Sequence, residues 1–459
     1  MTNIKFGTDG WRAILNKDFT FENTNKVVNG IATYIFNESR FNKTIIIGYD
    51  PRNKADEFAF YIGEKLSEYG FNVEISSKIV ATPVLAYSAL KKNSYAIMIT
   101  ASHNPPEYLG IKFIPPYGGP AEDTMVKVIV DNLDNEFNNR GEKKKYKKVS
   151  FEYGYIEHIK TLINFDKLGK SNIEINYDGH HGAAADIFKH ILNEYGIKAN
   201  FYNMERDINF GGHMPDPKEK YLPNLKAQCI SNSKIGLSND GDGDRFGVFD
   251  EKGNFVTAND IIAMLLKHLV KDKNYTGKLA KTVGASAMLD CYAKENNIEV
   301  VETPVGFKWL GSAMRKDDII IAGEESGGLS IKGHIPEKDG IIANLLIIEM
   351  IAYENKSLFE LHQEFLNGFK RKFINNRIDL KLDSKDEQQK IIDKFKKYSK
   401  IGSYNIVKSN TMDGLKLYLS DGSWILIRKS GTEPLLRIYF ESDKEEKMKE
   451  IEESIKELC

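Results

Sequence analysis

The sequence predicts an α/β fold in which three related α/β domains with mixed, mostly parallel sheets precede a smaller C-terminal α+β domain. Three observations predict this architecture. The chain has 459 residues, which is too long for one hydrophobic core. Short apolar runs alternate with helical patterns over most of its length, as in βαβ units. From about residue 370 the pattern changes to alternating strands and a charged helix.

The composition is that of a globular protein without a strong net charge. Hydrophobic residues make up 41% and charged residues 28% of the chain. Lys plus Arg (64) nearly equal Asp plus Glu (65), so we expect neither a nucleic-acid nor a membrane partner. The first residues lack the apolar segment of a signal peptide, and no apolar run reaches the roughly 18 residues of a membrane-spanning helix. The cysteines are scattered, which favours a reducing, cytoplasmic location over disulfides or a zinc site: Cys229, Cys291 and Cys459.

Residues 1–142 are predicted to form the first α/β domain. Three short apolar runs are typical of strands buried on both faces of a sheet, namely residues 44–49, 71–75 and 95–100. Residues 55–69 have helical spacing and stop at Gly70, a residue suited to end a helix. The basic stretch 141–148 is short and isolated, which favours a solvated linker or domain edge over a nucleic-acid patch.

The second and third α/β domains are placed at residues 150–252 and 253–368. Their predicted strands are residues 173–177, 278–283 and 318–322, and their predicted helices are residues 183–195, 259–270 and 286–296. An amphipathic helix is expected over residues 340–353. Each of these domains therefore repeats the order strand, polar loop and helix.

Residues 372–459 are predicted to form the smaller α+β domain. Residues 373–382 alternate like a strand, and residues 384–398 have the pattern of a charged helix. The Asp-Gly pairs that begin at Asp413 and Asp421 are typical of hairpin turns between short strands.

The clearest chemical signal is the loop Asp240-Gly-Asp-Gly-Asp-Arg245. Its carboxylates, Asp240, Asp242 and Asp244, converge on one hard cation only if the backbone curls, which the glycines permit. An EF-hand would need glycine in place of Arg245 and helices on both sides. A plain solvated turn would be unusual between apolar strands. We therefore predict a Mg²⁺ site that leaves room for a phosphoryl oxygen.

Two further loops that follow predicted strands offer groups suited to a sugar phosphate. In Gly323-Glu-Glu-Ser-Gly-Gly328, the carboxylates belong in a polar cleft, where Glu324 and Ser326 are suited to hold sugar hydroxyls. Lys338 adds a cation close in sequence. Arg428-Lys-Ser-Gly-Thr-Glu-Pro434 combines an arginine, two hydroxyls and a glycine, an anion cradle without the spacing of a Walker A loop. An ordinary turn is the alternative for each loop.

The run Thr100-Ala-Ser-His-Asn-Pro-Pro106 presents a serine hydroxyl at the end of a predicted strand, which the two prolines terminate. Alone, Ser102 would be an ordinary core or capping serine. Beside a Mg²⁺ site and an anion cradle, it is better interpreted as a carrier of a phosphoryl group that also ligates the metal. Arg12, in Phe6-Gly-Thr-Asp-Gly-Trp-Arg12, is a candidate clamp for phosphate.

Four of these loops resemble, in content and order, the signature loops of the α-D-phosphohexomutase family: residues 100–106, 240–245, 323–328 and 428–434. The resemblance spans essentially the whole chain. It implies four domains around a central cleft and reversible transfer of phosphate between C1 and C6 of a hexose phosphate. It also implies one Mg²⁺ ion per chain and a hexose 1,6-bisphosphate as intermediate and activator.

The resemblance also implies roles for individual residues. Ser102 would be the phosphoserine and would bind Mg²⁺ together with Asp240, Asp242 and Asp244. Arg12 and Lys112 would flank the transferred phosphate, and His103 and Lys112 are both candidates for the general acid or base. The implied substrate contacts are Arg245, Gly306, Lys308, Glu324, Ser326, Lys338, Arg428, Ser430, Gly431 and Thr432.

The preferred sugar stays open within this family. Gly328 stands where dual-specificity phosphomannomutase/phosphoglucomutase enzymes often carry histidine, whereas residues 303–308 and 334–340 are similar to glucose-type mutases. Glucose phosphates are therefore favoured as substrates, and mannose phosphates are considered as additional substrates. The last loop also resembles that of phosphoglucosamine mutase, which is the main alternative.

Two alternatives come from other classes, a metal-dependent sugar phosphatase and a non-catalytic sugar-phosphate sensor. A phosphatase would use the same aspartates but let water take the phosphate, whereas a sensor would have little use for both Ser102 and three metal carboxylates. We expect small-molecule sugar phosphates as the partners of a monomer or weak homodimer.

Overall fold

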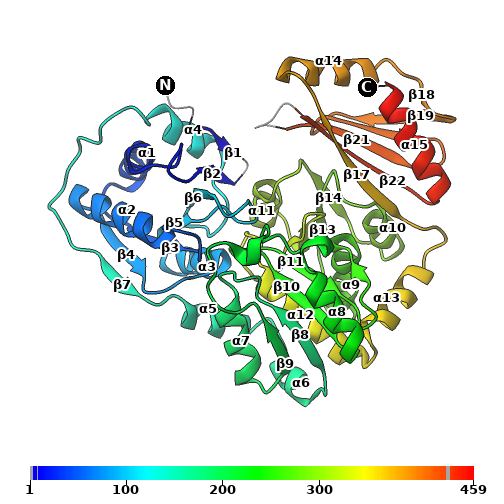
Figure 1. Cartoon of the computed structure of the whole chain (residues 1–459), viewed down its shortest axis with the longest axis horizontal. Helices are drawn as coiled ribbons and strands as arrows, with labels where there is room; N and C mark the ends of the chain where they lie inside the picture. Colours follow the sequence, from blue (N-terminus) through cyan, green and yellow to red (C-terminus); the bar gives the residue numbers. More distant parts are fainter. Residues whose placement is uncertain (1–3, 8, 431–434, 459) are drawn as a thin grey trace.

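Four β-sheets follow one another along the chain (Figure 1). The structure is a computed structural model that describes residues 4–7, 9–430 and 435–458. Three sheets are mixed and carry α-helices, and the fourth is antiparallel, as the sequence predicts. None of the helices in the described part of the chain combines the length and apolarity needed to cross a bilayer.

The first sheet has seven strands in the order β1-β2-β6-β5-β3-β4-β7. They are β1 (Phe6–Gly7), β2 (Gly10–Ile14), β3 (Thr44–Tyr49), β4 (Asn72–Ser76), β5 (Tyr95–Ile99), β6 (Tyr108–Ile114) and β7 (Lys147–Val149), and the helices are α1 (Phe21–Ser39), α2 (Ala55–Tyr69), α3 (Thr82–Lys92) and α4 (Asp123–Asp131). Helix α2 ends at Gly70 with φ 102°, as its glycine predicts. The end of the basic stretch forms the edge strand β7.

The second sheet has five strands in the order β12-β11-β10-β8-β9. They are β8 (Glu174–Asp178), β9 (Lys198–Tyr202), β10 (Ile235–Asn239), β11 (Phe246–Phe249) and β12 (Phe255–Val256). The helices are α5 (Glu152–Ile159), α6 (Phe165–Lys170), α7 (Ala185–Glu194) and α8 (Pro223–Asn232), with short 3₁₀ turns η1 (Phe210–Gly212) and η2 (Glu219–Tyr221).

The third sheet has four strands in the order β14-β13-β15-β16. They are β13 (Lys278–Thr282), β14 (Val300–Thr303), β15 (Ile319–Glu324) and β16 (Gly328–Ile331). The helices are α9 (Ala258–Lys271), α10 (Ala287–Glu295), α11 (Phe307–Lys316), α12 (Gly340–Glu354) and α13 (Leu358–Asn367).

The fourth sheet has six antiparallel strands in the order β17-β22-β21-β20-β19-β18. They are β17 (Ile374–Lys381), β18 (Lys400–Ile401), β19 (Tyr404–Asn410), β20 (Leu415–Leu419), β21 (Trp424–Lys429) and β22 (Leu435–Ser442), with helices α14 (Lys385–Phe395) and α15 (Glu445–Leu458). Both predicted Asp-Gly turns connect neighbouring strands of this sheet.

Each motif loop connects two strands that pair in antiparallel fashion. The pairs are β5–β6, β10–β11, β15–β16 and β21–β22. In the first three sheets, the strand that leads into the loop also pairs in parallel on its other side. A hairpin at this position presents its loop at the carboxyl end of the parallel strands, where ligand sites of α/β sheets lie.

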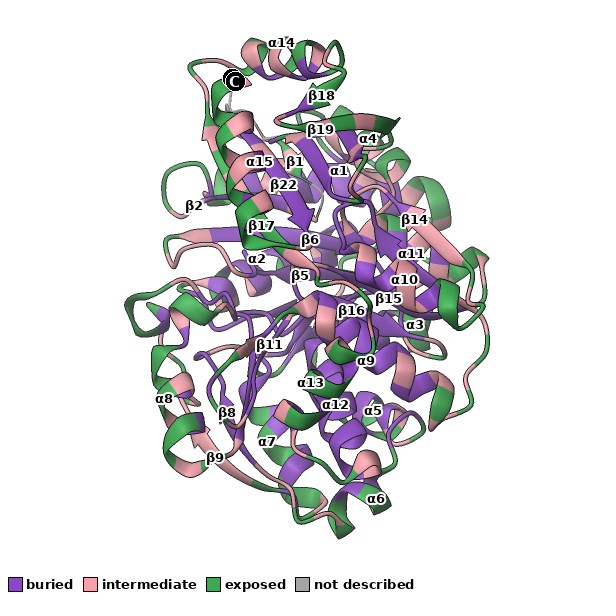
Figure 2. Cartoon of the chain, turned by 90° about the vertical axis from the view of Figure 1, so that its right-hand side faces the viewer, coloured by how far each residue is buried: buried purple, intermediate pink, exposed green. Residues whose placement is uncertain are grey.

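Helix α12 is not amphipathic, which corrects the sequence-based expectation. Its residues from Gly340 to Ala352 are all buried (Figure 2), because the helix contacts elements of both the second and the third sheet. Its polar residues have partners inside the protein, although Asn344 Oδ1 accepts no hydrogen bond from the described residues. Asn344 donates to the Ser238 carbonyl at 3.3 Å, and Glu349 forms an ion pair of 2.7 Å with Lys273.

Hydrophobic packing joins the first three sheets more closely than the fourth. One continuous core includes residues of α3, α7, α9 and α12, and therefore spans all three α/β units. The fourth sheet has a core of its own, formed by its strands with α14 and α15. The first three sheets thus share a common interior, to which the fourth is attached.

Candidate active site

Ser102 lies in the loop between β5 and β6, in contact with the acidic loop of the second sheet. Its Oγ donates a hydrogen bond of 2.9 Å to Asp240 Oδ2 and lies 3.3 Å from His103 Nδ1. The backbone of Ser102 has φ 53°, a left-handed conformation that an L-residue adopts only where its surroundings enforce it. Its N–H donates to Thr100 Oγ1 at 2.8 Å.

A buried arginine, Arg52, enforces this loop conformation. Its guanidinium donates at 2.6 to 3.1 Å to four backbone carbonyls of the loop, those of Ser102, Asn104, Pro105 and Tyr108. Arg52 Nε also pairs with Asp50 Oδ2 at 3.3 Å, and both side chains are fully buried. Burial raises the pKa of Asp50 to about 6, although the Arg52 charge opposes this shift. Arg52 therefore holds the Ser102 loop in this conformation.

Asp240, Asp242 and Asp244 converge in the loop between β10 and β11. All three are fully buried, and each offers an oxygen within 4.8 Å of the others. The curl of the loop depends on Gly243, whose φ is 78°. Thr82, at the start of α3, donates to Asp242 Oδ2 at 2.6 Å and so connects the first sheet to this loop.

This carboxylate cluster fits a divalent cation. Asp242 Oδ1 and Asp244 Oδ1 are buried and have no hydrogen-bond partner among the described residues. Burial, together with repulsion from its two neighbours, raises the pKa of Asp240 well above its usual range. Carboxylate oxygens are the ligands that Mg²⁺ prefers, so the donor set is suited to that ion.

Two lysines form ion pairs with the carboxylate cluster. Lys112 Nζ lies 2.8 Å from the Oδ2 atoms of Asp9, Asp242 and Asp244. Lys338 Nζ lies 3.0 Å from Asp244 Oδ2 and 3.3 Å from Asp9 Oδ2. Burial would lower the pKa of Lys112, but the carboxylates outweigh it and hold this pKa well above its usual range.

His103 and Arg12 lie beside the Ser102 loop. Burial, followed by the charges of Arg245 and Arg12, holds the pKa of His103 well below its usual range, so its ring is neutral at pH 7. Arg12 Nη1 donates to Asn104 Oδ1 at 2.7 Å. A neutral imidazole and a guanidinium thus both contact the loop that carries Ser102.

Arg245 is held near this centre by Asp216, a residue that no motif singled out. The Arg245 N–H donates to Asp240 Oδ1 at 3.1 Å, and its Nη1 lies 3.8 Å from Asp216 Oδ1. The other oxygen of Asp216 pairs with Lys218 Nζ at 2.6 Å. Asp216 therefore holds two cations whose charges also lower the pKa of His103.

Glu324 and Ser326 lie in the hairpin of the third sheet. Glu324 is buried at the end of β15, and burial raises its pKa to about 7, with the Lys338 charge acting in the opposite direction. Ser326 is half-buried in the loop before β16. The neighbouring Glu325 accepts a hydrogen bond of 3.0 Å from Thr282 Oγ1, which ties the loop to β13.

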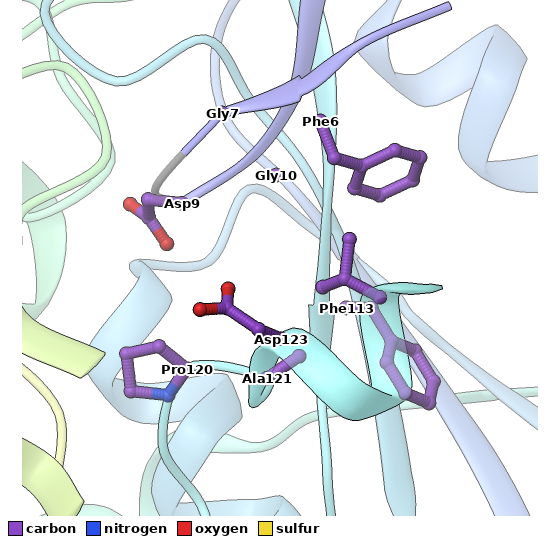
Figure 3. A pocket seen from close by; sticks show the side chains of 9 residues that line it. Phe6, Gly7, Asp9, Gly10, Phe113, Pro120, Ala121 and Asp123 are labelled. Atoms are coloured by element: carbon purple, nitrogen blue, oxygen red, sulfur yellow. The ribbon is translucent and has the colours of Figure 1, made fainter. Parts of the chain in front are cut away.

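Gly306 and Lys308 lie at the start of α11, next to the first sheet. Gly306 has φ 120° immediately before the helix. Lys308 Nζ pairs with Asp123 Oδ1 at 2.6 Å, across to α4. Figure 3 shows that Asp123, the partner of Lys308, lines the same pocket as Asp9, which contacts Lys112.

Arg428 lies at the end of β21, and its partner connects the third and fourth sheets. Arg428 Nε donates to Asp413 Oδ2 at 2.8 Å. The same oxygen accepts from the Val305 N–H at 2.9 Å, one residue before Gly306. Asp413 therefore ties Arg428 to the loop of Gly306.

Ser430 continues this loop and is buried. Its carbonyl accepts a hydrogen bond of 3.2 Å from Gln388 Nε2 of α14. The predicted contacts Gly431 and Thr432 lie outside the described residues.

The structure thus brings most of the predicted residues to one centre and adds others that the sequence-based reasoning missed. The additions are Asp9, Arg52, Thr82, Asp216 and Asp413. Arg52 had a signal, because Asp50-Pro-Arg52 follows a buried strand in the same way as the motif loops do. Thr82 and Asp216 had none, since their contacts with the acidic loop depend on the tertiary fold.

Comparison with known proteins places the chain in a class of sugar-phosphate enzymes. Four family profiles match in order, described as phosphoglucomutase/phosphomannomutase alpha/beta/alpha domain I (residues 3–140), domain II (153–253), domain III (257–369) and the C-terminal domain (380–458). The chain belongs to the phosphoglucomutase/phosphomannomutase family. It is accordingly an intramolecular phosphotransferase, an isomerase.

Curated relatives carry two different names. A phosphoglucomutase/phosphomannomutase of Thermococcus kodakarensis is 29% identical over 97% of this chain and 96% of its own. Phosphoglucosamine mutases of Methanocaldococcus jannaschii and Methanococcus vannielii are 30% and 33% identical, over 89% and 88% of this chain and 90% and 89% of theirs. These relatives agree on the mutase class and differ in the sugar.

A solved structure has the same overall fold. The phosphoglucomutase parafusin from Paramecium, in an open form, superposes with a TM-score of 0.84 at 25% identity, covering 98% of this chain and 94% of its own. The four-domain arrangement is therefore that of a phosphohexomutase.

Proposed function

We propose that this enzyme interconverts hexose 1-phosphate and hexose 6-phosphate, preferably of glucose, through a phosphoserine at Ser102 and a hexose 1,6-bisphosphate. One observation carries the proposal. The Ser102 hydroxyl is held 2.9 Å from a carboxylate of the buried cluster, in a loop whose conformation is fixed. A serine with this environment is suited to carry a phosphoryl group next to a divalent cation.

Residues Ser102, Asp240, Asp242 and Asp244 would hold Mg²⁺, which when bound supplies positive charge beside the phosphoryl oxygens. Further positive charge beside Ser102 and the carboxylate cluster comes from Arg12, Lys112, Arg245 and Lys338. Glu324 and Ser326 would accept and donate hydrogen bonds to sugar hydroxyls. The phosphate that is not transferred would be held by Arg428, Ser430, Gly431 and Thr432, with Gly306 and Lys308 as further substrate contacts.

The cycle needs two phosphoryl transfers, one from Ser102 and one back to it. First, a free hydroxyl of the hexose monophosphate attacks the phosphorus on Ser102, the P–Oγ bond breaks, and the hydroxyl proton is released as Oγ regains one. The bisphosphate then turns end for end. Next, the Ser102 hydroxyl attacks the other phosphate, and its proton leaves as the sugar oxygen gains one.

His103 is favoured over Lys112 as the group that exchanges the proton of Ser102. Its Nδ1 lies 3.3 Å from Oγ, and its ring is neutral, so in the tautomer protonated at Nε2 this atom can accept the proton. Lys112 instead donates to carboxylates and stays protonated, so its role is electrostatic.

Product analysis tests the proposal. With Mg²⁺ and a trace of glucose 1,6-bisphosphate, glucose 1-phosphate should yield glucose 6-phosphate, followed by ³¹P NMR. Inorganic phosphate as the main product would instead identify a phosphatase, and ligand binding without any product would identify a sensor.

A phosphoglucosamine mutase is the second candidate, favoured by the names of the M. jannaschii and M. vannielii relatives. The ratio of kcat/KM for the 1-phosphates of glucose, mannose and glucosamine decides between the sugars. A preference for glucosamine 1-phosphate would overturn the choice of glucose and leave the phosphoserine chemistry in place.

A further inference from the structure

Gly328 lies beside the sugar-binding loop and has a conformation that any residue can adopt. It pairs with Glu324 across the β15–β16 hairpin. Its neighbour Gly327 needs to be glycine because its φ is 95°, but the backbone of Gly328 lies outside the left-handed region. The reason for a glycine at position 328 must therefore be space.

The space above Gly328 is filled by the stem of Lys338. A Cβ atom added at Gly328 would lie 2.5 Å from Lys338 Cδ and 2.7 Å from its Cγ. These distances are far below van der Waals contact, so a side chain at position 328 and the present path of Lys338 exclude each other. The same Cβ would lie 3.5 Å from Glu324 Oε1.

Hydrogen bonds of the two residues that follow Lys338 hold its backbone in place. The Asp339 N–H donates to the Leu329 carbonyl at 2.9 Å, and the Gly340 N–H donates to the Gly243 carbonyl at 3.1 Å. Asp339 also caps α12 through the Ile341 N–H at 2.9 Å. The backbone on the C-terminal side of Lys338 is thus fixed to β16, to the acidic loop and to a buried helix.

The other end of Lys338 is fixed by charge. Its ammonium pairs with Asp244 Oδ2 at 3.0 Å and Asp9 Oδ2 at 3.3 Å, and its side chain is 6% exposed. Between these two fixed ends, the aliphatic stem of Lys338 passes directly over Gly328.

We propose that Gly328 is a positioning residue of the mutase: its missing side chain is what lets Lys338 reach the carboxylate cluster, so the two residues act as one unit. This inference rests on the proposed function for its activity readout. Any side chain at position 328 displaces the ammonium from Asp244 and Asp9, and the reacting phosphate loses one of its cations.

A double-mutant cycle tests this unit in the full-length protein. The variants are Gly328→Ala, Lys338→Ala and their combination, with Gly154→Ala as control, because a Cβ at Gly154 meets only Tyr87, at 3.8 Å. The first readout is kcat and KM for glucose 1-phosphate. Lys338→Ala should lower kcat/KM about tenfold in the wild-type background and less than about twofold in the Gly328→Ala background.

The second readout is the Kd of Mg²⁺ alone, measured by calorimetry, which does not depend on mutase activity. Lys338→Ala and Gly328→Ala should each tighten Mg²⁺ binding, because one cation fewer competes for Asp244, and their combination should tighten it no further. Equal, additive effects of Lys338→Ala in both backgrounds would overturn the proposal. Absence of mutase turnover in the wild-type protein would count against the proposed function, whereas the Mg²⁺ cycle would still decide the role of Gly328.

Folding is controlled within the same set of variants. If Gly328→Ala fails to fold, the combined variant should fold, because Lys338→Ala removes the Cγ and Cδ atoms that the new Cβ meets. Failure of both to fold would contradict the steric explanation.

Discussion

At the scale of single residues, the reactivity of Ser102 depends on neighbours that hold its loop. Arg52 donates to four carbonyls of this loop and pairs with buried Asp50. Such a planar array of donors pre-organises a loop in a way that a single ammonium group does not. The serine is thus presented to the acidic loop in one fixed orientation.

Replacing Arg52 with lysine should therefore impair the transfer step. The charge beside Asp50 is kept, but an ammonium group has three donors and no planar fork. We expect kcat to fall at least about tenfold with a smaller change in KM. Arg140→Lys, at an exposed position, is the control. An unchanged kcat for Arg52→Lys would show that this clamp does not set the geometry of Ser102.

The sequence predicts the residues that carry chemistry better than those that position them. Ser102 and the three aspartates lie in compact motifs, so their proximity follows from loops at the ends of strands. Asp216 contacts Arg245, and Asp413 accepts from the Val305 N–H, only because distant segments meet in the fold. No local pattern identifies such pairs.

At the scale of elements, the site is built from hairpin loops that touch one another. A Cβ at Gly241, in the acidic loop, would lie 2.7 Å from the Ser102 carbonyl oxygen. The loop of the second sheet is therefore in backbone contact with the loop of the first.

Gly241→Ala should push these two loops apart. We expect weaker Mg²⁺ binding and a kcat at least about tenfold lower, since both depend on the distance between Ser102 and the aspartates. Calorimetry of Mg²⁺ binding measures the first effect. Gly284→Ala is the matched control, because its added Cβ would meet atoms no closer than 3.5 Å. Equal Mg²⁺ affinity in both variants would contradict this account.

Hydrophobic periodicity predicts the elements well but not their pairing. The helix over residues 55–69 and the strand over residues 44–49 have the predicted bounds. The antiparallel return of β6, β11, β16 and β22 was not predicted, because strand direction depends on partners far along the chain. The complete burial of α12 was missed because Asn344 and Glu349 look like an exposed face until their buried partners are known.

At the scale of the whole molecule, the C-terminal domain is attached to the third domain through polar contacts and through a small apolar cluster in which Val283 packs with Trp424, Leu426 and Tyr439. Lys416 Nζ donates to the Val283 carbonyl at 2.7 Å, and Glu441 accepts from the Ala287 N–H at 3.1 Å. Burial lowers the pKa of Lys416 from 10.5 to about 8; the nearby Lys281 charge acts in the same direction and Glu302 opposes it. This interface therefore contains a buried group that titrates.

Lys416→Met should remove a pH dependence of stability. Between about pH 8 and pH 10.5 the unfolded chain binds more protons at this lysine than the folded one, so its contribution to stability rises with pH in that window. Below about pH 8 both states are protonated and the folded state bears the full penalty. We expect the Tm of wild type, relative to Lys416→Met, to increase from pH 8 to pH 10. A difference that stays flat or falls would contradict the assigned burial of the charge.

The central claim is that Ser102 carries the phosphoryl group, and intact-protein mass spectrometry tests it most directly. Protein incubated with glucose 1,6-bisphosphate and Mg²⁺ should gain the mass of one phosphoryl group, and Ser102→Ala should gain none. Wild-type protein without an adduct, or an adduct that persists in Ser102→Ala, would contradict the account.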